Sequence, residues 1–410
     1  MLSREKTKTD DQRQDVNDYP VKEQYVLSRL LPEYVSLYRI DLNSGKYEIL
    51  RLDANTNARQ LAEKDPHPAE NFDEYVRRYA DNFILDEEKE EFIDCLYDLF
   101  HKEEKEDYDS FLDMLYGKFG KSIVEKFLKP YNEKLYAVDL KTLDKDAMGR
   151  FFPYADIPAI IDNMKANKDS TSYNNSFLYP RNGAGSFIQI LYDALDSSKI
   201  LMEHEVVKID NEHKVAQLDD GSKINYEYLI NTSPLNHFLG YFEGEKFSAL
   251  KNRLSYNKVL VFNLGFNKKS KFTEEHWMYI PDKAVNFYRI GFYDNILDAD
   301  KLSMYIEIGY GKEDEITEQD VEMQLKLTLE NLHKLGIIDD DTKLEEHSTI
   351  IMDPAYVHIN TETEKMVQQF KAEEEKNGIY TIGRYGAWTY CSMEDCMIAA
   401  RDLAMSLCQG

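Results

Sequence analysis

The C-terminal part of the chain has the residue types and spacing of a ligand-binding turn. A short apolar strand is predicted at 379–382, and it leads into Gly383 and then Gly386, where the backbone can approach another group closely. Ser392 and Asp395 have the spacing of a capping box, which predicts that a helix begins there. A helix N-terminus offers N–H donors and partial positive charge. The arrangement suits a flat, electron-rich ligand, but a plain strand–turn–helix that closes a domain has the same pattern.

Two other segments could contribute to a site. The segment FLYPRNGAGS at 177–186 leads from a strand end into Gly183 and Gly185 and then a helix, but it lacks the third glycine of a dinucleotide-binding fingerprint. Taken alone, it is more typical of a tight turn. The segment PYNEKLY at 130–136, followed by Arg150, places polar groups between aromatic rings. Such residues can line a pocket, and they can equally form a polar loop that caps helices.

Other catalytic and metal-binding motifs are absent from the sequence. There is no Walker A loop, no GxSxG elbow and no HExxH motif, and the nine histidines have no metal-ligand spacing. No two cysteines form a CxxC pair, and four in 410 residues are too sparse for a disulfide framework. We therefore expect free, buried thiols at Cys95, Cys391, Cys396 and Cys408.

Composition and charge narrow the class of protein. The chain has 410 residues, of which 42% are hydrophobic and 31% charged, as in a globular protein of two or three domains. Aspartate and glutamate (76) outnumber lysine and arginine (50), and the net charge of −26 argues against nucleic-acid binding. No apolar run approaches the ~20 residues of a membrane-spanning helix, and residues 1–24 lack the apolar core of a signal peptide. We therefore expect a soluble, cytoplasmic protein.

Hydrophobic patterning predicts the elements that position these segments. We expect a flexible lead-in over 1–24 and a β-hairpin over 35–52, where two alternating strands flank a turn. Apolar residues at helical spacing predict helices within 70–100. From 108 to 200 the pattern is mainly helical, with one helix ended by Pro130.

Strands dominate after residue 200. The pattern predicts them at 201–209, 214–218, 226–231, 259–266, 286–292 and 303–310. Thr317 and Asp320 form a further capping box, which starts a helix that Gly336 closes. We therefore expect an α+β fold in which one antiparallel sheet, from 214–232 and 259–310, backs the helical layer.

Taken together, these segments resemble the flavin-containing amine oxidase and protoporphyrinogen oxidase superfamily, in its branch similar to UDP-galactopyranose mutase. The resemblance covers about 108–408 and implies a FAD-linked oxidoreductase fold with FAD as cofactor. Its markers occur in family order: YNEKLYAV at 131–138, FLYPRNGAGS at 177–186, EVVKID at 205–210, YLINTSP at 228–234 and IGRYGAWTYCSMED at 382–395. The last of these is the most specific.

The resemblance also implies roles for residues of the last marker. Gly383 and Arg384 match the glycine–arginine pair at the strand end that contacts the flavin. Trp388 and Tyr390 match aromatic residues beside the isoalloxazine ring. The resemblance does not identify a side-chain acid or base for catalysis.

Further roles follow from the same resemblance. Ser392 and Met393 match the helix start whose N–H groups face the pyrimidine carbonyls of the flavin, and Val206 matches the residue that contacts adenine. The implied substrate is a small molecule, anionic or sugar-nucleotide-like. Local positive charge beside the turn is expected from one of three arginines, Arg150, Arg181 or Arg289.

The sequence departs from the family on its N-terminal side. Family members open with a strand, a GxGxxG turn, a helix and an acidic residue ending the second strand, which together bind the ADP half of the flavin, and this sequence has no such unit. Residues 25–105 instead resemble the opening hairpin and helices of a PAS-like sensor module. We therefore expect 106–410 to be an amine oxidase-like domain without its dinucleotide-binding half. Ala387 and Cys391 also depart from the family within the last marker.

Two functions remain open at this point. The glycines and the capped helix at 383–395 favour a FAD-dependent oxidoreductase or mutase-like protein with impaired flavin binding. The missing dinucleotide fingerprint favours the alternative, a non-catalytic binding or sensor-like protein that carries a remnant of the flavoenzyme domain. We expect mostly colourless protein on purification, because the pyrophosphate of FAD would lack the helix N-terminus on which it normally rests.

Overall fold

The computed structural model describes residues 23–31, 34–41, 47–53, 86–148, 177 and 179–409, and their side chains from 93 to 408. The chain forms two compact units, which comprise residues 1–101 with 153–176 and residues 102–152 with 177–410. Among the described residues, no helix is long and apolar enough to cross a membrane.

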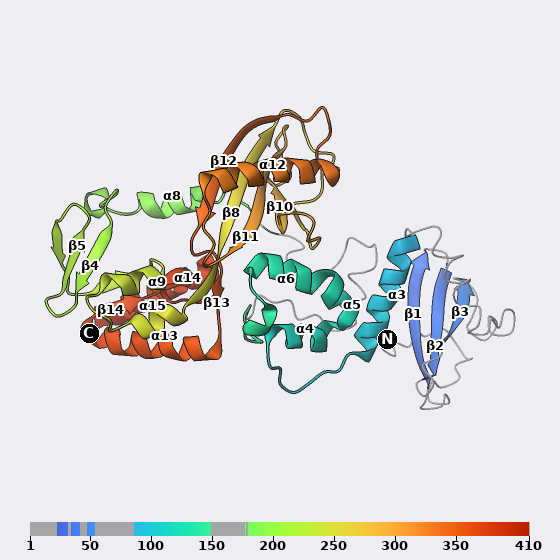
Figure 1. Ribbon diagram of the computed structural model, residues 1–410, viewed down its shortest axis with the longest axis horizontal. Coiled ribbons are helices and arrows are strands. Elements are labelled where there is room, and N and C mark those ends of the chain that lie inside the picture. Colours follow the sequence, from blue (N-terminus) through green and yellow to red (C-terminus); the bar gives the residue numbers. More distant parts are fainter. Residues whose placement is uncertain are drawn as a thin grey trace. The chain divides into compact units, whose positions relative to one another are not determined.

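The smaller unit contains an antiparallel three-stranded sheet in the order β1-β2-β3 (Figure 1). Strands β2 (Tyr34–Asp41) and β3 (Tyr47–Asp53) confirm the predicted hairpin. Strand β1 (Glu23–Leu31) was not predicted, because its apolar residues do not alternate with polar ones. Helix α3 (Asp86–His101) is one of the expected helices, and the other, near 72–83, lies outside the described residues.

The larger unit is built on a six-stranded antiparallel sheet, which we call the sheet body together with helix α12 (Glu318–Lys334). Its path is β12-β8-β11-β10-β9, and β13 pairs with β8. Apolar residues of α12 pack against the buried side chains of this sheet, and the expected capping box of Thr317 and Asp320 starts the helix (Figure 1). The strands are β8 (Ser255–Phe266), β9 (Trp277–Tyr279), β10 (Arg289–Phe292), β11 (Ser303–Gly311), β12 (Leu344–Met352) and β13 (Val357–His358).

The expectation of one sheet from 214–232 and 259–310 is wrong. Strands β4 (Val206–Asp210), β5 (Val215–Leu218) and β6 (Lys223–Asn225) form a separate three-stranded sheet, because tight turns close each pair locally. Strand β7 (Leu229–Asn231) instead pairs in parallel with β14 (Ile379–Thr381), and the Leu229 N–H donates to the Gly378 carbonyl at 2.9 Å. Hydrophobic patterning predicts where strands form but not which strands pair. The separation of β4–β7 from the larger sheet was therefore not predicted.

The expectation that Pro130 ends a helix is also wrong. Helix α6 (Lys129–Tyr136) follows a π-helical turn at Val124–Leu128, and Pro130 lies in its first turn. A proline is tolerated there because the first N–H groups of a helix have no intrahelical acceptor. Before α6 come α4 (Phe111–Phe119) and α5 (Lys121–Ile123), and after it come the short helix η4 (Leu140–Thr142), α8 (Gly185–Asp193) and η6 (Ser197–Lys199).

A second apolar core lies beside β14. Its buried members include Leu235, Leu254, Phe370, Ile379 and Trp388. The helices that contribute side chains to it are α9 (Leu235–Phe238), η7 (Leu239–Tyr241), α10 (Ser248–Arg253), α13 (Thr361–Glu374) and α14 (Gly383–Gly386). Helix η8 (Glu375–Asn377) follows α13, α15 (Met393–Gln409) follows α14, and α11 (Tyr293–Leu297) contacts β11. The predicted strand at 379–382 and the helix after Ser392 are thereby confirmed.

Candidate functional site

An ion pair across two neighbouring strands forms the first part of the site. Arg289 on β10 stands directly opposite Glu307 on β11 in the antiparallel register. The guanidinium donates to Oε1 of Glu307 from Nε at 3.0 Å and from Nη2 at 2.5 Å, and the Tyr288 hydroxyl donates to Oε2. Burial alone would lower the pKa of Arg289, but the facing carboxylate raises it above its usual value. The pair therefore keeps both charges inside the fold.

Aromatic rings surround this guanidinium. The Tyr305 ring lies 5.5 Å from its central carbon, and burial raises the pKa of Tyr305 to about 12. This packing requires Gly291, since a Cβ there would lie 2.0 Å from the Tyr305 ring. Tyr279 on β9 stands opposite Arg289, and Tyr131 from α6 meets Tyr279 edge-on at 4.9 Å between ring centres. Strand register and α6 together place aromatic rings around a fixed ion pair.

The turn that contains α14 supplies a second guanidinium. The central carbon of Arg384 lies 4.5 Å from the ring centre of Tyr390 and 5.6 Å from that of Tyr356. The two rings are themselves stacked, 6.0 Å apart at 18°. Such cation–π contacts hold a guanidinium by its face and leave its in-plane N–H groups for a ligand.

Tyr356 connects the two guanidiniums. Its pKa is raised by burial and by the Glu307 carboxylate, whereas Arg289 and Arg384 both act to lower it. Both guanidiniums are therefore within electrostatic range of one half-buried phenol. We call Arg289, Arg384 and Tyr356 the arginine–tyrosine cluster, together with Glu307 and the surrounding rings of Tyr131, Tyr279, Tyr305 and Tyr390.

Tyr136, at the end of α6, adds an unsatisfied polar group to this cluster. Its ring meets that of Tyr356 edge-on at 6.3 Å. Its hydroxyl is buried and has no hydrogen-bond partner among the described residues. Burial raises its pKa, Tyr390 raises it further, and Arg384 acts to lower it. A buried hydroxyl without a partner costs about 1–3 kcal/mol, which a polar ligand at this position would offset.

His358 holds the backbone of Tyr136 in place. Its Nε2 lies 3.1 Å from the Tyr136 carbonyl and donates to it, which leaves Nδ1 to accept from the Ser255 hydroxyl at 2.8 Å. Burial lowers the pKa of His358 to about 4. The imidazole is therefore neutral at pH 7 and acts as a structural hydrogen-bonding group.

The remaining predicted flavin contacts divide between the core and the surface. Trp388 is 5% exposed, adopts a positive φ of 51° and packs edge-on against Tyr256 at 5.9 Å. Its indole Nε1 is buried without a hydrogen-bond partner among the described residues. Val206, at the start of β4, packs against the same apolar core. Met393, in contrast, is 60% exposed in the first turn of α15.

The two glycines of the turn differ in what they permit. Gly383 has a φ of 78°, and a Cβ there would have only the Cys396 sulfur within 4 Å, at 3.9 Å. At Gly386 the backbone of the turn lies close to β7, because a Cβ there would lie 2.7 Å from the Asn231 carbonyl oxygen. Gly386 thus seats the turn on the parallel strand pair, while Gly383 keeps a backbone conformation that other residues rarely adopt.

The capping box at the start of α15 has the predicted form. The Ser392 hydroxyl accepts from the Asp395 N–H at 3.2 Å, and the Asp395 carboxylate accepts from the Ser392 N–H at 2.8 Å. The backbone N–H groups of Ser392 and Asp395 are thereby satisfied within the capping box. The N–H groups of the intervening first-turn residues have no intrahelical acceptor and can meet a flavin carbonyl. These donors fit the flavin role that the resemblance implies.

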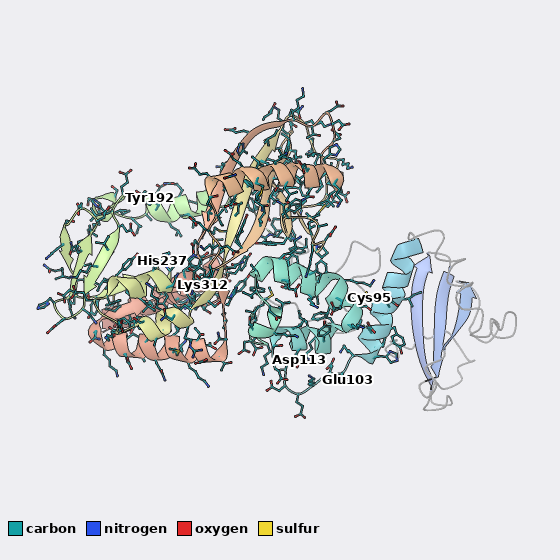
Figure 2. All side chains as sticks on the ribbon, in the orientation of Figure 1. Cys95, Glu103, Asp113, Tyr192, His237 and Lys312 are labelled. Carbon is teal, nitrogen blue, oxygen red and sulfur yellow. The ribbon has the colours of Figure 1, made fainter. Side chains whose placement is uncertain are left out.

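The other two segments prove mainly structural. The Lys134 ammonium in PYNEKLY donates to three carbonyls, those of Ile280, Asp282 and Phe287, and burial lowers its pKa to about 8. It therefore fastens α6 to the loop before β10. Residues 179–186 form an exposed turn, and Tyr192 on the following helix α8 is also exposed (Figure 2). Of the three arginines expected to supply charge, Arg289 lies in the cluster, Arg181 is exposed and Arg150 is outside the described residues.

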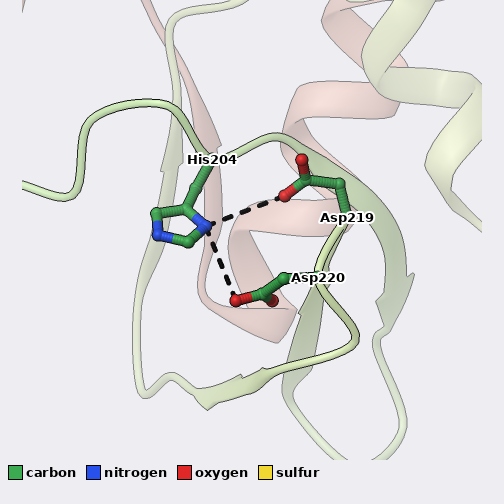
Figure 3. A group of neighbouring side chains, drawn as sticks. All are labelled: His204, Asp219 and Asp220. Carbon is green, nitrogen blue, oxygen red and sulfur yellow. Dashed lines mark ion pairs between the residues drawn. The ribbon is translucent and has the colours of Figure 1, made fainter.

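One histidine lies beside two carboxylates on the surface. His204 Nδ1 is 3.7 Å from an oxygen of Asp219 and 3.7 Å from an oxygen of Asp220 (Figure 3). Both carboxylates already accept backbone N–H groups, from Glu205 at 3.2 Å and from Ser222 at 2.9 Å. All three side chains are exposed. We interpret the group as the capped β5–β6 turn with a surface ion pair, which contributes about 0–1 kcal/mol.

Sequence reasoning did not find several members of the cluster. Glu307, Tyr305 and Tyr356 lie in or beside strands and have no motif of their own. Strand alternation places Glu307 and Tyr305 on one face, but only the register opposite β10 shows that this face carries Arg289. That register depends on contacts distant in sequence, so spacing alone could not predict it.

Comparisons with known proteins identify the family and the fold. The family model "Flavin containing amine oxidoreductase" matches residues 16–408. The crystal structure of a reduced UDP-galactopyranose mutase has a TM-score of 0.67 at 21% identity, covering 74% of this chain and 67% of that one. A protein from Exiguobacterium described as a protoporphyrinogen oxidase has a TM-score of 0.57 at 18% identity, covering 79% of this chain and 72% of that one. At these identities the two structures establish the fold. The chain belongs to the flavin-containing amine oxidoreductase family.

Proposed function

We propose that the protein is a FAD-dependent oxidoreductase or mutase-like enzyme with impaired flavin binding and a small anionic substrate. The arginine–tyrosine cluster next to the Gly383–Ser392 turn is the observation that carries the proposal. Arg384 provides positive charge in a chain whose net charge is −26, and Arg289 belongs to the same cluster with its charge balanced by Glu307. A local cationic site in an acidic protein selects an anionic ligand through the few groups that face it.

The residues that would hold the flavin are those of the turn and of the first turn of α15. Gly383 leaves room beside the strand end, and Ser392 starts the helix whose free N–H groups favour negative charge. Trp388 has a buried indole N–H without an acceptor among the described residues. Val206 and Tyr390 complete the proposed contacts. A bound flavin supplies the capacity to accept and return a hydride.

The chain's own residues would bind and orient the substrate. Arg384 lies beside the stacked rings of Tyr356 and Tyr390, where its N–H groups can donate to a ligand, and the Tyr136 hydroxyl lies in the same cluster. Arg289 is held by Glu307, so the ion pair stays fixed in the cluster and adds no net charge. Such preorganised donors suit a phosphate or diphosphate group, and with the fold they support a sugar-nucleotide-like substrate.

Flavin affinity should be low, because the sequence has no glycine turn for the ADP half. Each missing charge-assisted hydrogen bond removes about 1.5–3 kcal/mol, and several together weaken binding by orders of magnitude. Titration of the full chain with FAD, followed by flavin fluorescence, should show partial uptake. Stoichiometric, tightly held FAD in the purified protein would contradict the impaired-binding part of the proposal.

Gly383→Val tests the proposed flavin contact. Valine at a positive φ and beside the strand end should abolish FAD uptake, whereas Gly221→Val imposes the same backbone strain in the exposed β5–β6 turn, where nothing lies within 4 Å. Fluorescence titration of both variants separates ring contact from general strain. Equal FAD uptake by Gly383→Val and the parent would show that this turn is only structural.

Arg384→Lys tests the anion site without removing charge. Lysine cannot stack a flat group against the Tyr390 ring or donate in one plane, so the affinity for UDP should fall about tenfold or more, equivalent to one charge-assisted hydrogen bond. Calorimetric titration with UDP measures this. The alternative function, a non-catalytic binding protein, is favoured by the missing dinucleotide fingerprint. It predicts UDP or substrate binding with no FAD uptake and no flavin-dependent turnover.

A further inference from the structure

Cys391 and Cys396 bring two thiols together at the start of α15. Their sulfur atoms lie 3.6 Å apart in an S–H···S contact. All four cysteines are free thiols, as expected, but the expected burial is wrong: Cys408 is exposed and the other three are partly exposed. The pairing was not predicted, because a spacing of five residues matches no redox or metal motif.

The capping box explains why the two sulfur atoms meet. Ser392 is the N-cap of α15, so Cys391 occupies the position before the cap and Cys396 the fourth helical position. These are the two positions that pack together in a hydrophobic staple. The Cys396 N–H donates to the Ser392 carbonyl at 3.2 Å, which fixes the second thiol relative to the cap. Local backbone geometry thus holds the thiols face to face.

We propose that Cys391 and Cys396 are a reversible dithiol–disulfide pair, closed by exchange with a small-molecule disulfide. A disulfide bond needs the sulfur atoms at about 2.05 Å, so rotation of the two side chains must shorten the present separation by about 1.5 Å. Any apolar pair would serve a staple, but two thiols at these positions can also react. Partial exposure of both residues admits a small reagent.

The exchange balances without any other reactant. One protein thiolate attacks the small disulfide, forms a mixed disulfide and releases one small thiolate. The second protein thiolate then attacks the protein sulfur of the mixed disulfide and expels the other small thiolate. Overall, the two cysteines lose two hydrogen atoms and the small disulfide gains them as two thiols. A dithiol reductant reverses the reaction.

Burial sets the pH dependence of closure. Burial, and then the hydrogen bond with Cys396, raise the pKa of Cys391 to about 11. Cys391 must lose its proton whether it attacks first or second, because both sulfur atoms act as nucleophiles in turn. Its thiolate fraction is small at pH 7, so the rate of the step in which Cys391 attacks should rise about tenfold per pH unit from pH 7 to 9.

Closure would act on the turn rather than on global stability. The bond closes a loop of only a few residues, and such a short loop restricts the unfolded chain little. Its local effect is larger, because Cys396 carries the sulfur that lies 3.9 Å from the Cβ position at Gly383. The disulfide would tie the residue before the helix cap to the helix turn beside Gly383. The proposal does not depend on a bound flavin.

The test uses the full chain with Cys95→Ser and Cys408→Ser, which leaves only the pair. Incubation with oxidised glutathione at pH 7, 8 and 9 should remove both maleimide-reactive thiols. Tryptic digestion gives one peptide, residues 385–401, that contains both cysteines and no other cleavage site. Its mass should fall by about 2 Da, the loss of two hydrogen atoms, and dithiothreitol should restore it. Cys391→Ser in the same background should stop at a stable mixed disulfide on Cys396.

Several outcomes would overturn the proposal. One is a parent protein in which the mixed disulfides with glutathione never convert to the Cys391–Cys396 disulfide. Another is a pair of thiols that stay reduced at pH 9 although both react with maleimide in denaturant. A peptide map of the natural chain keeps the test decisive if the serine variant does not fold. That map would contradict the proposal if it linked either residue to Cys95 or Cys408 in place of the other.

Discussion

Two parts of the larger unit bury their apolar residues to different extents. In the sheet body, Phe262, Ile290 and Met304 are fully buried. The second part, which we call the C-terminal layer, comprises β4–β7, α8, β14 and α15. There, Ile190 is 68% exposed and Ile230 is 49% exposed. The sheet body has a large buried core and exposes apolar side chains mainly on β12 and α12, whereas the C-terminal layer exposes them on most of its elements, including β4, β6, β7, α8 and α15.

The parallel pair β7–β14 shows the difference most clearly. Ile379 on β14 is buried in the second core, whereas Ile230 on the adjoining strand faces solvent. Parallel strands normally have both faces covered. The family resemblance implies a strand–GxGxxG–helix unit that this sequence lacks, and an open face on a parallel pair is consistent with that absence. We infer that the C-terminal layer is the less stable part of the unit.

Truncating one apolar side chain in each part should give the largest contrast. Phe262→Ala leaves a cavity in the sheet body and should lower the free energy of unfolding by about 3–5 kcal/mol. Ile190→Ala, on the exposed helix α8, should change it by less than about 0.5 kcal/mol. Denaturant unfolding followed by circular dichroism measures both. Similar losses for the two variants would show that α8 is covered in solution and would remove the contrast.

The sheet body was the more predictable part, and the reason is physical. The apolar run at 259–262 and the alternation along 303–310 were strong enough to locate β8 and β11. Strand β12 was missed because most of its side chains are exposed and give no such pattern. Pairing was not predictable, so β7 was assigned to the wrong sheet.

The candidate site was predictable only where a local motif exists. Gly383, Ser392 and Asp395 follow from turn and cap chemistry within a few residues. The assignments of Val206, Trp388 and Tyr390 to flavin contact stay predictions. The Arg289–Glu307 pair depends on the β10–β11 register, which arises from packing of the whole sheet.

Acid should weaken the sheet body through His358. The pKa of this buried imidazole falls from 6.5 to about 4 on folding, so between these values the unfolded chain binds a proton that the folded chain does not. Stability is therefore complete above pH 6.5 and falls as the pH drops toward 4, by up to about 3 kcal/mol. Unfolding by urea from pH 7 to 4 should show this loss in the parent and a smaller one in His358→Gln.

A matched histidine variant separates this effect from general acid unfolding. His347 on β12 is exposed, so His347→Gln should retain the parent's pH dependence. If His358→Gln and His347→Gln gave the same pH profile, His358 would not carry the effect.

The smallest effect compares two helix caps of the same kind. Thr317 caps α12 in the sheet body, and Ser392 caps α15 in the C-terminal layer. Either change to alanine removes a cap that contributes about 1 kcal/mol. Because α12 packs on the sheet core, Thr317→Ala should lower the global free energy of unfolding by that amount. Because α15 belongs to the less stable layer, Ser392→Ala should instead speed hydrogen exchange of α15 amides about fivefold and leave the global transition unchanged. Hydrogen exchange with mass spectrometry, read alongside urea unfolding, distinguishes the two. An equal shift of the global transition in both variants would mean that α15 unfolds together with the sheet body.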